Sequence, residues 1–127
     1  MPAAQLDYLR QPTTTAGRRG NELPSVLRPT TVTILRLLAA EMEMRSLGVS
    51  RLALFGSVLR NEARADSDVD LLVQFAAGRK SFDGFMKLGD LLEARLGHRV
   101  ELVTVESLSP FIGPRILAEA LDVLRAA

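Results

Sequence analysis

Two aspartates, one residue apart, are the first feature of this sequence that could carry chemistry. Asp68 and Asp70 open an apolar run that we expect to be a strand over residues 68–75. Side chains two apart on a strand leave the same face, so these carboxylates repel each other unless a cation lies between them. Oxygen ligands of this kind suit Mg²⁺ or Mn²⁺, and Mg²⁺ favours one or two carboxylates together with substrate phosphates. The pair therefore predicts a site for a metal–nucleotide complex.

A Gly-Ser pair ends the preceding apolar run, with ten residues between it and Asp68. Gly56 would let the backbone approach a phosphate closely, and Ser57 adds a hydroxyl donor. If a helical turn begins here, its free N–H groups point at the same place. Arg60, one turn further on, could reach a phosphate as a charged fork, although a plain solvated helix residue is the alternative. These groups converge if the two strands are neighbours in one sheet.

A third acid, Glu101, is the only carboxylate in the apolar run over residues 100–103. Acids are almost never buried unless they are paired or bound to something. If its face is shared with Asp68 and Asp70, three carboxylates surround one or two metal ions, and the third can take the proton from an attacking hydroxyl. The alternative is a surface acid on an edge strand, paired with Arg99. Three acids, a divalent cation and a Gly-Ser turn together indicate phosphoryl or nucleotidyl transfer.

The elements that must position these residues follow from apolar periodicity and from turn residues. We expect helices over residues 30–47, 82–96 and 112–125, a helical turn at 58–60, and strands at 51–55, 68–75 and 98–104. This order predicts an α/β or α+β fold, a small mixed sheet with helices packed mainly on one face.

Composition limits the class of protein. The chain has 127 residues, 47% of them apolar, which suits one domain with a modest core. A net charge of +1 argues against a protein that holds nucleic acid mainly through charge. The absence of cysteine excludes disulfides and thiolate zinc sites, and the single histidine, His98, cannot supply a multi-histidine metal site.

Residues 1–24 carry few groups that a core could bury. We expect them to be a disordered leader, with the folded domain over residues 25–127. The alternative is a basic arm that contacts a partner through Arg10, Arg18 and Arg19. No apolar run approaches the ~20 residues of a membrane-spanning helix, and no signal peptide is visible, so the expected location is the cytoplasm.

The segments Phe55–Ala63 and Asp66–Val73 resemble the signature of the DNA-polymerase-β-like nucleotidyltransferases, and within them the minimal nucleotidyltransferase (MNT) family. The resemblance covers about residues 29–124. It extends to the run over residues 100–104 and to Glu119-Ala120 near the C-terminus.

This resemblance implies a nucleotidyltransferase fold and roles for several residues. It implies that the triphosphate of ATP, the substrate, is held by Gly56 and Ser57, with help from Arg60 and Ser67. It also implies that Mg²⁺, or Mn²⁺, is bound by a set of three acids, with the third as candidate base: Asp68, Asp70 and Glu101. Many MNT proteins are antitoxins that move AMP from ATP onto a tyrosine of a HEPN-domain ribonuclease toxin.

The sequence departs from the family pattern at two positions. Asn61 replaces the usual glycine, and asparagine tolerates a positive φ better than most residues. Glu101 replaces the usual aspartate, and a misplacement of ~1 Å can cost ~100-fold in rate. The leading function is thus AMP transfer to a partner toxin. The alternatives are a catalytically weak or inactive antitoxin that acts by binding alone, and a small-molecule nucleotidyltransferase, for whose usual helical substrate domain the chain has no room.

Overall fold

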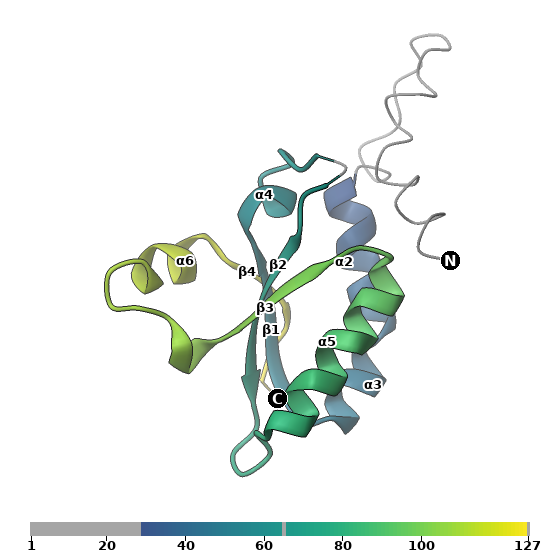
Figure 1. Ribbon diagram of the computed structural model, residues 1–127, viewed down its shortest axis with the longest axis vertical. Helices are drawn as coiled ribbons and strands as arrows, with labels where there is room; N and C mark the ends of the chain where they lie inside the picture. Colours follow the sequence, from purple (N-terminus) through teal and green to yellow (C-terminus); the bar gives the residue numbers. More distant parts are fainter. Residues whose placement is uncertain (1–28, 65, 127) are drawn as a thin grey trace, which may run out of the picture.

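The computed structural model describes residues 29–64 and 66–126, so the expected leader lies outside the described residues (Figure 1). The elements follow in the order α2 (Pro29–Ala39), α3 (Glu41–Ser46), β1 (Val49–Phe55), α4 (Gly56–Leu59), β2 (Val69–Phe75), α5 (Phe82–Leu96), β3 (Val100–Thr104), the 3₁₀ turn η2 (Val105–Ser107), α6 (Gly113–Glu119) and β4 (Leu121–Leu124).

The four strands form one mixed sheet in the order β3-β2-β1-β4. β1 runs antiparallel to both β2 and β4, whereas β2 and β3 are parallel and are joined through α5. In this register Phe55 lies beside Asp70, and Asp70 lies beside Glu101. The predicted mixed sheet is confirmed, and its two central strands bring the Gly-Ser pair next to the aspartates.

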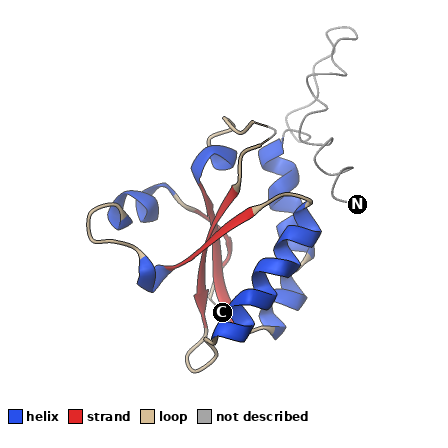
Figure 2. Cartoon of the chain, in the orientation of Figure 1, coloured by secondary structure: helices blue, strands red, loops and turns tan. Residues whose placement is uncertain are grey.

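Helices α2, α3 and α5 cover one face of the sheet (Figures 1 and 2). Their apolar sides meet strand residues such as Leu54 and Leu71, both fully buried. Two local features set the ends of α5: the Ser81 hydroxyl accepts a hydrogen bond from the Gly84 N–H at 3.0 Å, and Gly97 takes a left-handed φ of 67°. No helix in the described part of the chain has both the length and the apolar character needed to cross a membrane.

The single helix expected over residues 30–47 is divided in two. Ala40, between α2 and α3, has φ −97° and ψ 10°, which interrupts the helix. The interruption leaves Leu37, Ala40 and Met44 all fully buried against the sheet. Gly48 then turns the chain into β1 with φ 93°.

The helix expected over residues 112–125 is wrong in its second half. α6 ends at Glu119, and residues 121–124 form β4 instead. β4 pairs with the edge of β1 that β2 leaves open, in the register Leu52 to Leu124 and Leu54 to Leu121. Helical spacing of apolar residues was the misleading signal, because backbone pairing with β1 overrides local periodicity.

Candidate active site

The aspartates and Glu101 lie on the sheet face opposite helices α2, α3 and α5. Asp70 is two residues from Leu72, which belongs to the small cluster on that face, and Glu101 is two residues from Val103, which packs against the same cluster. Burial raises the pKa of Asp70, and the charges of Glu101 and Asp68 raise it further. The structure thus brings the three predicted acids into electrostatic contact at one end of the sheet.

The Gly-Ser turn lies directly against Asp70. Gly56 begins α4 with φ 79°, and a Cβ added there would lie 2.9 Å from Cγ of Asp70. Any other residue would therefore be strained in its backbone and would also collide with the carboxyl group. Gly56 thereby holds the turn and Asp70 in a fixed relative position. The sequence indicated this contact only through the spacing between the two residues.

Asn61 closes the same turn with φ 60°, so asparagine does adopt the left-handed backbone expected of it. Its N–H donates to the Val58 carbonyl at 3.1 Å. Ser67 lies in the following loop, where its hydroxyl accepts a hydrogen bond from the Arg64 N–H at 2.8 Å. The hydroxyl therefore braces the loop that delivers Asp68.

Glu101 is exposed on the edge strand β3. Arg99 pairs with Asp68 instead, with 3.6 Å between Nε and Oδ1. The pairing of Glu101 with Arg99, one alternative from the sequence, is therefore not the one observed. Within residues 29–64 and 66–126, no group of three or more His, Cys, Asp or Glu side chains is arranged to hold a metal ion. The acids are close enough to repel one another but do not enclose a common point.

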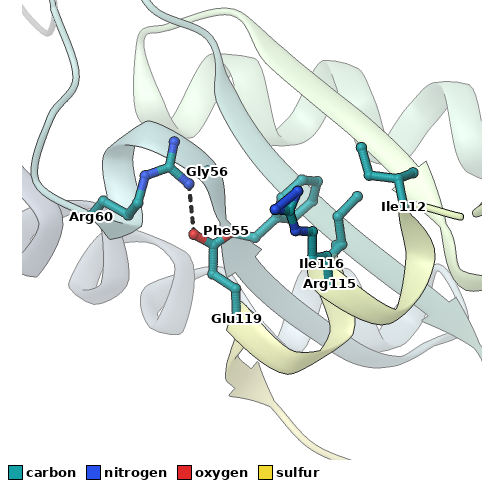
Figure 3. Close-up of a pocket in the computed structure, with 7 residues that line it drawn as sticks. All are labelled: Phe55, Gly56, Arg60, Ile112, Arg115, Ile116 and Glu119. Atoms are coloured by element: carbon teal, nitrogen blue, oxygen red, sulfur yellow. Dashed lines mark hydrogen bonds and ion pairs between the residues drawn. The ribbon is translucent and has the colours of Figure 1, made fainter.

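Arg60 contacts a residue for which the sequence predicts no role. Its Nη1 lies 2.6 Å from Oε2 of Glu119, the last residue of α6, and its Nε lies 3.0 Å from Oε1 of Glu62 (Figure 3). The hydrogen bond from Arg60 is the main cause that lowers the pKa of Glu119, and a hydrogen bond with the Gly56 backbone acts in the same direction. Both carboxylates raise the pKa of Arg60 above its ordinary value.

A pocket of about 560 Å³ opens beside this ion pair (Figure 3). It is lined by side chains from β1, α4 and the α6 region: Phe55, Gly56, Arg60, Ile112, Arg115, Ile116 and Glu119. Its size is in the range of small-molecule sites, and it combines an apolar wall with two arginines. Such a lining suits a nucleotide, with phosphates at the arginines and an apolar ring system against the wall. The family resemblance includes Glu119 but assigns it no role, because no local pattern shows that α6 folds back over β1.

Comparison with known proteins agrees with this geometry. The nucleotidyltransferase domain family matches residues 35–123. The protein adenylyltransferase MntA of Thermococcus cleftensis is 43% identical over 88 residues, which cover 68% of this chain and 88% of that protein. The solved structure of a minimal nucleotidyltransferase has a TM-score of 0.58 at 39% identity, covering 69% of this chain and 93% of that one.

A second solved structure shares the fold at lower identity. It is the complex of the tri-AMPylated HEPN toxin of Shewanella oneidensis with an MNT antitoxin, with a TM-score of 0.53 at 21% identity and coverage of 74% of this chain and 73% of that one. The family match includes the Gly56 turn, both aspartates and Glu119. The chain belongs to the nucleotidyltransferase domain family, among the minimal nucleotidyltransferases related to the MntA protein adenylyltransferases.

Proposed function

We propose that this protein transfers AMP from ATP to a tyrosine hydroxyl of a partner protein, a HEPN-domain toxin, and acts as its antitoxin. The observation that carries the proposal is the contact of Gly56 with Asp70, because Gly56 also lines the pocket that contains Arg60. Backbone N–H groups and an arginine fork favour phosphate, and the carboxylates favour a cation beside it. Nucleotide chemistry needs these groups within reach of one another.

The proposed reaction is an in-line substitution at the α-phosphorus of ATP. The acceptor oxygen forms a bond to that phosphorus, while the bond from phosphorus to the oxygen bridging to the β-phosphate breaks. Pyrophosphate leaves, and the hydroxyl proton passes to a carboxylate, for which Glu101 is our candidate. Gly56, Ser57 and Arg60 would hold the triphosphate, and Ser67 would support the loop before Asp68.

The acids fit a divalent cation by charge and donor type. Burial raises the pKa of Asp70, and the charges of Glu101 and Asp68 raise it further, so a bound cation would stabilise the ionised carboxylate. Asp68 and Asp70 would hold Mg²⁺, or Mn²⁺, which would neutralise phosphate charge and polarise the reacting phosphate when bound. The lack of a three-acid group in the described residues accords with Mg²⁺ bound by two carboxylates and substrate phosphates.

The partner is proposed from the relatives. An MNT antitoxin of the same fold is in complex with an AMPylated HEPN toxin, and the MntA relative is named as a protein adenylyltransferase. Protein acceptors also agree with the open position of the acids, since Glu101 is exposed and an incoming hydroxyl can approach it from solvent.

A second candidate function is inhibition of the partner by binding alone. The exposed position of Glu101 on an edge strand favours this alternative, because a poorly placed base would leave transfer slow. In that case AMP transfer would be slow or absent, and contact of the protein surface with the toxin would inhibit it.

The deciding experiment incubates the co-expressed partner with the protein, Mg²⁺ and ATP labelled at the α-phosphate. We expect label on the partner with the wild-type protein and none with the double variant Asp68→Asn/Asp70→Asn. The matched control is Asp66→Asn, which removes an exposed acid from the same loop but not from the sheet face. Toxin activity is measured in the same samples. If the partner stays unlabelled and both proteins still neutralise it, inhibition by binding alone becomes the function of this protein in place of AMP transfer.

A further inference from the structure

Glu119 connects three parts of the pocket through one side chain. It is the last residue of α6, the helix that lines one side of the pocket. Its carboxylate pairs with Arg60 at 2.6 Å, and the backbone N–H of Arg60 donates to the Gly56 carbonyl at 3.1 Å. Figure 3 shows Glu119 and Arg60 approaching each other from opposite sides beside Gly56. The contact therefore joins α6 to the turn at the start of α4.

Arg60 is held by two carboxylates rather than one. Glu119 accepts from its Nη1, and Glu62 accepts from its Nε at 3.0 Å. The Arg60 side chain is 48% exposed, so without these partners it would sample many rotamers in solvent. With both partners in place, the planar guanidinium has a fixed orientation and still has further N–H groups to offer a ligand.

We propose that Glu119 is a positioning residue for nucleotide binding, which holds the Arg60 fork and the Gly56 turn against the pocket so that the triphosphate of ATP meets a preformed site. The inference rests on the proposed function, because ATP is the ligand that it positions. Preorganisation improves affinity by removing the entropy cost of ordering groups during binding. Glu119 acts through Arg60 and Gly56 and need not touch the nucleotide itself.

The opposite role is a carboxylate that competes with phosphate for the same groups. Glu119 is negatively charged and would repel a triphosphate if its charge were unbalanced. Its closest partner is the Arg60 guanidinium at 2.6 Å, and Arg115 in the pocket lining also lowers its pKa. Two cations therefore balance the two carboxylates Glu119 and Glu62. This balance favours positioning over competition. Removing the Glu119 charge should weaken nucleotide binding if the residue positions Arg60, and should strengthen it if the residue competes with phosphate.

The first experiment measures the Kd of a non-hydrolysable ATP analogue with Mg²⁺, by isothermal titration calorimetry on the full chain. We expect Glu119→Gln to weaken binding about tenfold, because a charge-assisted contact becomes a neutral one. Glu119→Asp keeps the charge but shortens the reach, and we expect a smaller loss. Glu106→Gln breaks a comparable exposed pair, with Lys80, outside the pocket, and should leave the Kd unchanged.

The second experiment asks whether Glu119 acts through Arg60. Arg60→Gln is combined with Glu119→Gln, and the double variant should bind no more weakly than Arg60→Gln alone. In the AMP-transfer assay, Glu119→Gln should raise KM for ATP and leave kcat within about threefold, as expected for binding lost equally from ground and transition states. A merely structural role would instead lower the melting temperature and the folded fraction, without this division between KM and kcat.

Tighter or unchanged nucleotide binding by Glu119→Gln would overturn the inference, as would an additive loss in the double variant. Either result leaves the proposed function intact, provided that the wild-type protein binds the analogue. Failure of the wild-type protein itself to bind it with Mg²⁺ would overturn the proposed AMP transfer, and the positioning role with it.

Discussion

The two faces of the sheet are built for different tasks. The face under α2, α3 and α5 contains a cluster of fifteen buried apolar residues, drawn mainly from β1, β2, β4 and the three helices, and β3 adds the partly buried Val100 and Leu102. The opposite face buries three, Ala53, Phe55 and Leu72, beneath residues of α6 and of the segment that precedes it. That sparse face carries the acids, and Gly56 and the pocket lie beside α6 (Figure 3).

The difference shows how a small domain can be stable and still contain a site whose charges are unfavourable for folding. Three carboxylates on one face repel one another, and burial further disfavours the charge of Asp70. Such a face contributes little to folding, so the helix-covered face must supply most of the hydrophobic stabilisation. Substitutions on the two faces should therefore separate stability from activity.

The largest effect on stability is expected from the helix-covered face. Leu92 of α5 is fully buried, and Leu92→Ala should lower the free energy of unfolding by about 2–5 kcal/mol in urea titrations. AMP transfer per folded molecule should not change. Leu117→Ala is the matched control from α6, where the side chain is 41% exposed, and its effect should stay within about 0.5 kcal/mol. Equal losses in both variants would contradict the division between the faces.

The largest effect on rate is expected from Glu101. If it takes the acceptor proton, Glu101→Gln should lower kcat by roughly 100-fold or more in the labelled-ATP assay. The free energy of unfolding should not fall, because the side chain is exposed on the edge strand. A variant with wild-type kcat would make Glu101 an ordinary surface acid, and another group would then have to accept the proton.

Asp70→Asn should make the protein without metal more stable at neutral pH. The pKa of Asp70 is raised above its ordinary value of 3.8, so the folded state holds this proton more tightly than the unfolded state does. The wild-type protein therefore loses stability as the pH rises from about 4 through the raised pKa. We expect the advantage of the variant to be absent below about pH 4, to grow through that interval and then to level off.

The measurement for Asp70→Asn is a series of urea titrations between pH 3 and pH 8. Asp66→Asn serves as the control, because its side chain is exposed and lies away from the sheet face. With excess Mg²⁺ the wild-type protein should gain stability and the Asp70→Asn variant should gain less, because ligand binding to the folded state stabilises it. A variant that is less stable than the wild-type protein at neutral pH would show that the Asp70 charge has favourable partners.

Local chemistry made much of the fold and part of the site predictable. Ser81 and Gly97 mark the ends of α5 through capping and a left-handed backbone, which depend on few neighbours. The spacing from Gly56 to Asp70 predicted adjacent strands, and their pairing confirms it. Asn61 adopts the positive φ that its place in the motif requires.

The remainder depended on contacts between distant parts of the chain. The residues over 121–124 have the spacing of a helix but pair with β1, whose edge is open only in the folded sheet. Glu119 became a partner of Arg60 because α6 returns to the mouth of the pocket, 59 positions along the chain. No local pattern contains either fact, so the α6 side of the pocket was missed.

The smallest expected effect tests what holds β4, the strand that the sequence did not predict. Arg51 of β1 and Asp122 of β4 form an ion pair at 2.7 Å, with side chains 27% and 23% exposed. Asp122→Asn should lower the free energy of unfolding by only about 0.5–1 kcal/mol, because the backbone ladder and Leu124 retain the strand. Arg125→Ala removes a more exposed partner of the same carboxylate, 3.7 Å away, and should change almost nothing. A loss well above 1 kcal/mol for Asp122→Asn would mean that the ion pair, rather than strand pairing, holds β4 in place. In that case the variant should also loosen β4 near Leu121, and with it the adjoining α6, so that nucleotide binding weakens.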